Sequence, residues 1–248
     1  MLRLAYITDQ HISLEVENSL GIDTKTRFLD LLNIIILKRY DGIILGGDLG
    51  YTKGDLSTYL WFCEKLQVLQ LPVCITPGNH DNPGLIAKLF PDLPLNTESE
   101  MYYQRSWGDI NMIFLDTSKG FMLQKQYTWL ENLVSASPEK NVWICMHHPP
   151  VITGSMHMDG KYAFQQIEKF GRFCADYPLK KFHVFSGHCH LERTIVKDNI
   201  HVYITPSTYV NIDPDFEVFT AMRHQKSGFR ELIWLEQGAF LTNVLYCD

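Results

Sequence analysis

Apolar and polar residues alternate along the chain in blocks that predict strands and helices in turn. Residues 2–8 and 42–48 are short apolar runs, which is typical of buried strands. The segment 24–40 between them has apolar residues at helical spacing, with charged residues on the other face. These apolar positions are Phe28, Leu31, Leu32, Ile35 and Ile36.

The same rhythm continues to about residue 84. Residues 55–70 predict a second helix with Asp55 as its N-cap, and a third strand follows before the loop 77–81. Asn82-Pro83 is typical of the start of another helix. The order strand, helix, strand, helix, strand predicts parallel strands covered by helices.

The pattern changes after residue 100. Residues 101–107 and 110–117 predict a hairpin that turns at Gly108-Asp109. The remaining predicted elements are a helix at 123–136, a strand at 141–147, a helix at 162–177, a strand at 181–190, a hairpin at 192–206 turning at Asp198-Asn199, and three antiparallel strands after 215. We expect one α/β domain over residues 1–248, with two sheets packed face to face and helices outside.

Composition and charge narrow the function. Apolar residues make up 46% of the 248 residues and charged residues 20%, which is ordinary for a globular protein. The net charge is −6 and no basic stripe is visible, so an obligate nucleic-acid partner is not expected. A small phosphoester remains a suitable substrate if metal ions supply positive charge.

The six cysteines are irregularly spaced, and the chain has no C-x-x-C motif. This pattern predicts reduced thiols rather than a disulfide framework. The apolar stretch before Asp9 is too short for a signal peptide, and no run approaches the roughly 20 apolar residues of a membrane span. The expected location is the cytoplasm, with no membrane partner.

Five polar clusters each follow an apolar run. They are TDQH (8–11), GGDLG (46–50), PGNHD (77–81), MHHPP (146–150) and GHCH (187–190). Ligands bind at the carboxyl ends of parallel strands, so we expect these clusters to converge in space. Each alone has a plain structural reading, such as a tight turn or a surface histidine. Their joint placement at strand ends favours a shared site.

Spacing within two clusters suggests which side chains face that site. Asp9 and His11 are two residues apart, as are His188 and His190. On an extended segment both members of such a pair point the same way. Cys189 would then point to the opposite side, and no second cysteine lies at ligand spacing, so we expect Cys189 not to be a ligand.

The clusters together supply seven nitrogen or oxygen donors. These are Asp9, His11, Asp48, Asn79, His147, His188 and His190. Seven donors are too many for one tetrahedral ion but suit two ions that share a carboxylate. Carboxylate, amide and imidazole ligands together suit Mn, Fe, Zn, Co or Ni, so the expected cofactors are two divalent or trivalent transition metal ions.

The order D-x-H, G-D, G-N-H-D, H and G-H-x-H resembles the calcineurin-like metallophosphoesterase family over residues 9–190. Five further motifs resemble its class III cyclic nucleotide phosphodiesterase branch: FLDT (114–117), WLENL (129–133), MHHPP (146–150), MD (158–159) and TPST (205–208). The resemblance implies a four-layer α/β/β/α sandwich of two mixed sheets flanked by helices.

The resemblance also implies roles for individual residues. One metal would be held by Asp9, His11, Asp48 and His190, and the other by Asp48, Asn79, His147 and His188. His80 would contact the phosphate and protonate the leaving oxygen, and Asp81 would orient His80.

The activity that the resemblance implies is hydrolysis of a phosphodiester, with 3′,5′-cyclic nucleotides as candidate substrates. A hydroxide held between the two ions would attack the phosphorus. One alternative is a phosphomonoesterase or pyrophosphatase on the same site. Another is a scaffold that binds metal without catalysis, which the intact donors and His80 argue against. The oligomeric state is left open.

Three features have two readings each. Tyr51 follows Asp48 in a G-D-x-x-Y pattern that resembles purple acid phosphatases, but those enzymes lack the histidine that stands here at position 11. We therefore expect Tyr51 to be a loop residue. We expect His148 to support the site rather than bind metal, because His147 comes first. Residues 154–162 either border the substrate pocket or form a mobile surface loop.

Overall fold

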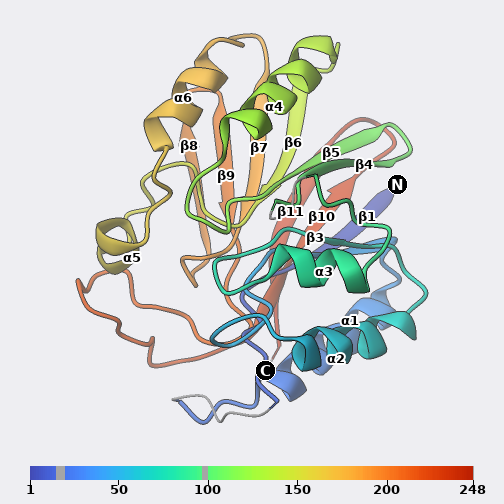
Figure 1. The fold of residues 1–248 in the computed structure, drawn as a ribbon, viewed down its shortest axis with the longest axis vertical. Coiled ribbons are helices and arrows are strands. Elements are labelled where there is room, and N and C mark those ends of the chain that lie inside the picture. Colours follow the sequence, from blue (N-terminus) through green and yellow to red (C-terminus); the bar gives the residue numbers. More distant parts are fainter. Residues whose placement is uncertain (15–19, 97–99, 248) are drawn as a thin grey trace.

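The computed structural model describes residues 1–14, 20–96 and 100–247, and its strands form two sheets (Figure 1). The first sheet has the order β11-β10-β1-β2-β3. Its strands are β1 (Leu2–Ile7), β2 (Gly42–Leu45), β3 (Val73–Ile75), β10 (Gly228–Trp234) and β11 (Phe240–Tyr246). The strands β1, β2 and β3 run parallel, and β10 and β11 are antiparallel to their neighbours, so this sheet is mixed.

The second sheet has the order β4-β5-β6-β7-β9-β8. Its strands are β4 (Tyr103–Trp107), β5 (Ile110–Leu115), β6 (Asn141–Met146), β7 (Lys181–Ser186), β8 (Arg193–Lys197) and β9 (Ile200–Ile204). The four central strands run parallel, while the edge strands β4 and β8 are antiparallel. This sheet is therefore also mixed.

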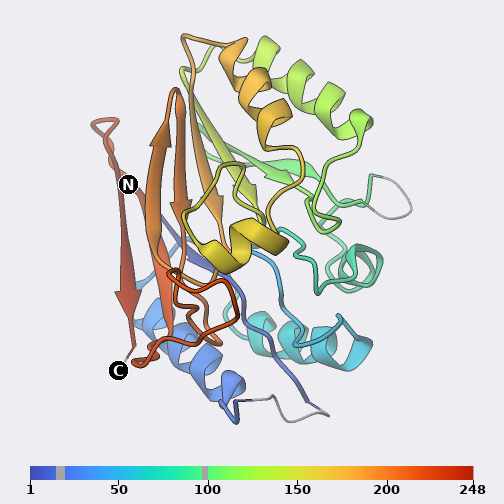
Figure 2. The same cartoon turned by 90° about the vertical axis from the view of Figure 1, so that its left-hand side faces the viewer.

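Six described helices connect and cover these strands. They are α1 (Thr24–Lys38), α2 (Leu56–Gln67), α3 (Pro83–Leu89), α4 (Gln124–Ala136), α5 (Met156–Lys161) and α6 (Ile167–Ala175). Figures 1 and 2 show α4 and α6 beside the second sheet, with α1 and α2 at the other end of the molecule. No helix in the described part of the chain is long and apolar enough to cross a membrane.

The central strands of both sheets bury side chains on their two faces. On β6, Trp143 and Cys145 belong to the core between the sheets, while Val142 and Ile144 pack with the helices outside. Aromatic contacts such as Trp143 with Trp234, at 5.1 Å between ring centroids, join one sheet to the other. The expected sandwich of two mixed sheets flanked by helices is confirmed.

Local signals in the sequence mark several boundaries correctly. The side chains of Asp55 and Asn82 cap α2 and α3 by accepting backbone N–H groups three residues on. Gly108 and Asp198 have positive φ angles of 57° and 53°, which the two tight hairpin turns require.

Three expectations about elements are wrong. The segment after 215 contains two strands among its described residues, not three, because 213–227 forms a loop with an isolated bridge between Ile212 and Ala221. The helix expected at 162–177 begins at Ile167, and the preceding loop contains α5. The strand expected at 181–190 ends at Ser186, because the backbone after Gly187 turns into left-handed conformations.

Candidate metal centre

The five polar clusters meet where the parallel strands of the two sheets end. Backbone hydrogen bonds join their loops, from Asp9 N–H to the Gly47 carbonyl at 2.9 Å and from His11 N–H to the Asp48 carbonyl at 2.9 Å. A third bond, from Gly187 N–H to the His147 carbonyl at 3.1 Å, joins the loops of the second sheet. Segments far apart in the sequence are thereby fixed around one point.

Two groups of buried side chains there have the geometry of metal sites. In each group the candidate ligand atoms lie within 4.8 Å of one another. The first group is Asp9, His11, Asp48 and His190, and the second is Asp48, His147 and His188. The groups share Asp48, so one carboxylate lies between two adjacent cation positions, as a binuclear site requires.

Backbone carbonyls fix the orientation of all four histidines in these groups. Each ring donates one N–H to a carbonyl: His11 Nδ1 to Tyr51, His147 Nδ1 to Gly46, His188 Nε2 to Tyr162 and His190 Nδ1 to Val210, at 3.3, 2.8, 2.8 and 2.8 Å. The other ring nitrogen of each therefore carries its lone pair toward the site. Such outer contacts set the tautomer of metal-binding histidines.

The facing nitrogens of His11 and His190 require positive charge between them. Their Nε2 atoms lie 3.1 Å apart, and His190 Nε2 is also 3.3 Å from the Asp9 carboxylate. Because both Nδ1 atoms donate elsewhere, these Nε2 atoms can face each other only across a shared proton or a metal ion. The residues present therefore fit a bound cation.

The pKa values of the histidines at this site also fit a bound cation. Burial lowers the pKa of His11 and of His188 to about 4, which keeps both rings neutral, as metal ligands must be. Burial also lowers the pKa of His147, but the carboxylates of Asp48 and Asp9 outweigh it and raise that pKa to about 9. The carboxylates thus draw positive charge onto this position.

The backbone at the ligands is strained. Five of the candidate ligands have positive φ angles: Asp9, His11, Asp48, His188 and His190, at 54°, 44°, 54°, 66° and 51°. Left-handed backbone at residues other than glycine costs free energy and clusters at functional sites. The expectation that each pair lies on an extended segment is therefore wrong, although both pairs do converge on the site.

Cys189 is absent from both donor groups, as expected. Its thiol lies 3.8 Å from the hydroxyl of Thr153, and the residue packs in the core outside the second sheet. Burial raises the pKa of this thiol above its ordinary value. The reason that Cys189 points away is the left-handed turn rather than strand alternation.

Close backbone approach at the site depends on glycine. A Cβ atom on Gly78 would lie 2.2 Å from Asp48 Oδ1, and one on Gly187 would lie 2.4 Å from Asp9 Oδ2. Real Cβ atoms do not come this close to other atoms, so both positions need glycine. These glycines let the loops pack against the carboxylates.

The loop after β3 carries three more candidate residues. The backbone N–H of His80 donates to Asp48 Oδ1 at 2.8 Å, and the His80 ring centroid is 4.9 Å from that of His11. Its Nδ1 is buried and has no hydrogen-bond partner among the described residues. Asn79, the residue before His80 in the sequence, is exposed. His80 is thus held beside the donor groups with one ring nitrogen uncommitted.

The Asp81 carboxylate binds backbone and side-chain groups of neighbouring segments. Its carboxylate accepts from the backbone N–H groups of Leu49 and Gly78 at 3.1 and 2.8 Å and from the Tyr59 hydroxyl at 3.1 Å. Among the described residues no hydrogen bond joins Asp81 to the His80 ring, and Asp81 ties the loop carrying His80 to the loop after β2 and to α2. Burial and the nearby Asp48 raise the pKa of Asp81 to about 6.

Residues that the sequence left ambiguous have defined contacts. His148 lies outside both donor groups, and its ring packs 4.0 Å from that of His188 while Nδ1 contacts the Thr117 hydroxyl at 3.1 Å. The Tyr51 ring packs against Tyr209, with centroids 5.7 Å apart. The carbonyls that hold the four histidines had no sequence signal, because any residue supplies a carbonyl.

Known proteins are similar to this chain in sequence or in fold. The chain is 32% identical over 219 residues to a probable cyclic nucleotide phosphodiesterase of Fibrobacter succinogenes, covering 88% of this chain and 84% of that one. It is 28% identical over 251 residues to a 3′,5′-cyclic adenosine monophosphate phosphodiesterase, CpdA, of Vibrio vulnificus, covering 98% and 89%.

A solved structure of similar fold is a dimetal phosphatase from Danio rerio, with a TM-score of 0.68, 12% identity and coverage of 93% and 94%. At this identity the match concerns the fold alone. The profile of the family described as calcineurin-like phosphoesterase matches residues 2–192. This match, together with the shared motifs and the buried donor groups, confirms the resemblance. The chain therefore belongs to the calcineurin-like phosphoesterase family and is a metallophosphoesterase.

Proposed function

We propose that this protein hydrolyses small phosphodiesters at a binuclear metal centre, with 3′,5′-cyclic nucleotides as its substrate class. The observation that carries the proposal is the pair of buried donor groups that share Asp48. The two relatives described above, which are named cyclic nucleotide phosphodiesterases, support the substrate class.

Seven side chains would hold the two ions. Asp9, His11, Asp48 and His190 would hold one, and Asp48, Asn79, His147 and His188 the other. Nitrogen and oxygen donors of this kind suit Mn, Fe, Zn, Co or Ni. Bound ions would neutralise the phosphate and supply a nucleophile at neutral pH.

His80 would deliver the proton that the leaving oxygen needs. Its ring lies beside His11 at the edge of the donor groups, and it is part-buried rather than enclosed. An imidazole suits this task because its ordinary pKa is near neutrality. Such proton transfer contributes roughly 10²–10⁴ in rate.

Asp81 would act as a positioning residue. It fixes the loop that presents His80 and Asn79 through three hydrogen bonds to neighbouring segments. We therefore assign it no direct contact with substrate.

The test is hydrolysis by protein stripped of metal with a chelator and then reloaded with Mn²⁺. The substrates are bis(p-nitrophenyl) phosphate, a diester, and p-nitrophenyl phosphate, a monoester, followed by a panel of cyclic nucleotides. Preference for the diester, restored by Mn²⁺, supports the proposal. Preference for the monoester moves the assignment to a phosphatase, and no turnover with two ions bound moves it to a scaffold.

The cytoplasm is the location that we propose. All six cysteines are free thiols, and four of them are buried. Free thiols persist in a reducing compartment. Fractionation of cells that express the tagged protein tests this, since recovery from the periplasm would contradict it.

A further inference from the structure

The helix α5 and the segment 213–220 are attached to the candidate metal ligands. The Tyr162 carbonyl, at the end of α5, accepts from His188 Nε2 at 2.8 Å. The Ile212 N–H donates to the His190 carbonyl at 2.9 Å. This bond ties the start of the segment 213–220 to His190, another candidate ligand. The end of α5 and the start of the segment 213–220 therefore lie next to the candidate ligands.

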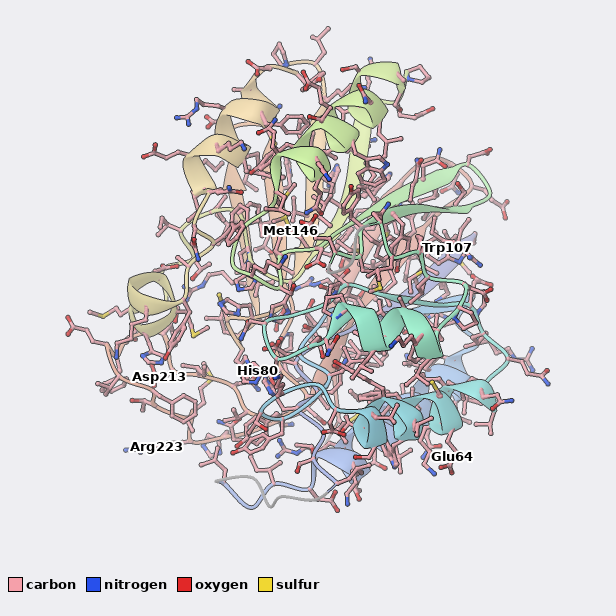
Figure 3. All side chains as sticks on the ribbon, viewed as in Figure 1. Glu64, His80, Trp107, Met146, Asp213 and Arg223 are labelled. Atoms are coloured by element: carbon pink, nitrogen blue, oxygen red, sulfur yellow. The ribbon has the colours of Figure 1, made fainter. Side chains whose placement is uncertain are left out.

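The two segments also bind each other. The Met156 N–H donates to the Pro214 carbonyl at 2.9 Å, and His157 Nδ1 donates to the Glu217 carbonyl at 3.0 Å. The His157 ring lies 5.4 Å from that of Tyr162 and 6.3 Å from that of Phe219. In Figure 3, Asp213 and Arg223 lie at the lower left of the molecule, and His80 lies further toward its middle. The segments thus form one continuous surface beside the ligands.

This surface exposes large apolar side chains that belong to neither hydrophobic core. Six large ones are between 48% and 63% exposed: Ile152, Met156, Tyr162, Phe216, Val218 and Phe219. We call these six residues the apolar wall. Ile152 lies in the loop that leads into α5, and the other five residues come from α5, its C-cap and the segment 213–220. Single exposed apolar residues are ordinary, but a group from joined segments indicates a binding surface.

The charges along the wall restrict what it can bind. Asp213, Asp215 and Glu217 lie in the same segment as its phenylalanines, and the last two are exposed. A further phosphate group would be repelled here, because like charges across an interface are unfavourable. A neutral and preferably aromatic group fits both the charge and the exposed rings.

We propose that the apolar wall binds the neutral organic group of the diester, with Tyr162 and Phe219 as the residues that determine specificity. This inference rests on the proposed function. A nucleoside is the class of ester group that it fits, because aromatic side chains stack on any base. The wall therefore favours nucleoside diesters over diesters with small alkyl groups and over substrates with additional phosphates.

The test compares two diesters that share p-nitrophenol as leaving group, thymidine 5′-(p-nitrophenyl) phosphate and methyl p-nitrophenyl phosphate. The readout is kcat/KM for the thymidine diester divided by kcat/KM for the methyl diester. A general loss of enzyme activity affects both values and therefore cancels in this ratio. We expect Tyr162→Ala and Phe219→Ala each to lower this ratio by about tenfold, as for the loss of a stacked ring. Tyr162→Phe keeps the ring and should keep the ratio.

The matched control is Leu179→Ala, which removes an apolar side chain that is 85% exposed in the turn before β7, away from the site. It should leave the ratio unchanged. An unchanged ratio in both wall variants overturns the proposal. So does a dimer of the wild type in sedimentation velocity that Val218→Glu dissociates, because a second copy would then cover the wall.

Failure of the proposed function has a different signature. If the Mn²⁺-loaded wild type turns over neither diester, the phosphodiesterase assignment fails. The wall is then tested by calorimetric binding of thymidine 5′-phosphate and of methyl phosphate. The quantity compared is the Kd of methyl phosphate divided by the Kd of thymidine 5′-phosphate. A fall of this ratio in Tyr162→Ala and Phe219→Ala supports the proposed role of the wall, and an unchanged ratio overturns it.

Discussion

At the residue scale, the orientation of each histidine at this site is set by the backbone carbonyl that its other ring nitrogen contacts. Four histidines point one nitrogen at a shared centre because the other nitrogen is bound to a carbonyl. The arrangement is costly without a cation, since buried lone pairs and carboxylates then face one another. Metal binding and local order should therefore depend on each other.

At this scale, Asp48 is the residue that both donor groups share. We expect Asp48→Asn to reduce the bound metal from two ions per chain to fewer than two, and to lower diester turnover by more than about 100-fold, because even outer contacts of metal ligands cost 10–100-fold. Mass spectrometry of the metal content after dialysis measures the first effect. Asp30→Asn, an exposed position on α1, is the control. Two tightly bound ions in Asp48→Asn would contradict the shared ligand.

His80 should affect the chemistry without affecting metal content. We expect His80→Ala to retain two ions and to lower kcat for a cyclic nucleotide by roughly 10²–10⁴, the usual range for a lost proton donor. The loss should be much smaller for bis(p-nitrophenyl) phosphate, whose leaving group departs without a proton. Equal losses for the two substrates would rule out the proton-donor role.

At the scale of elements, the loops matter more than the strands. The strands bring five loops to one edge, and the loops hold each other through backbone bonds such as that from Gly54 N–H to the His80 carbonyl. Asp81 is the side chain that joins three of these elements. Its role is to keep the loop after β3 in place.

The expected result of Asp81→Ala follows from those contacts. The free energy of unfolding should fall by about 1.5–3 kcal/mol, as for lost hydrogen bonds to a charged group. Activity on both diester types should fall in parallel, because the variant displaces the whole loop. A defect in proton donation by His80 alone would affect mainly the cyclic nucleotide. Urea unfolding and the two kcat values check this. A loss confined to cyclic nucleotides would show that Asp81 acts through the His80 ring after all.

At the scale of the whole molecule, one polar cluster joins the first sheet to α1. The Glu231 carboxylate on β10 accepts from Arg3 on β1 at 2.7 Å, from Asn243 on β11 at 2.9 Å and from Tyr40 after α1. Burial raises the pKa of Glu231, but these hydrogen bonds outweigh it and hold the pKa below the ordinary value of 4.5.

This shift predicts a pH dependence of stability. A carboxyl with a lowered pKa stabilises the fold above its unfolded pKa, and the contribution is lost as pH falls through the folded pKa. At neutral pH we expect Glu231→Gln to cost roughly 1.5–3 kcal/mol. The difference should begin to shrink as the pH falls below the ordinary value of 4.5, and the two proteins should become equally stable once the pH is below the lowered folded pKa. A difference that persists there in urea unfolding would assign the cost to packing.

The sequence by itself determined most of the order of elements and which polar clusters meet at one site. Asp55, Asn82 and the Gly108-Asp109 turn act on their immediate neighbours, so they could be read locally. Six of the seven expected donors lie in the two donor groups. They could be named because each cluster follows an apolar run, and parallel strands bring such ends together.

Only the tertiary structure decided how those donors are held. The left-handed backbone at His188 and His190, the carbonyls behind the rings and the contacts of Asp81 all come from segments distant in the sequence. The short helix α5 and the loop at 213–227 also depend on contacts across the molecule, such as His157 with the Glu217 carbonyl. Local patterns cannot encode these features, because the partner that fixes each one is a backbone group or a residue in another loop.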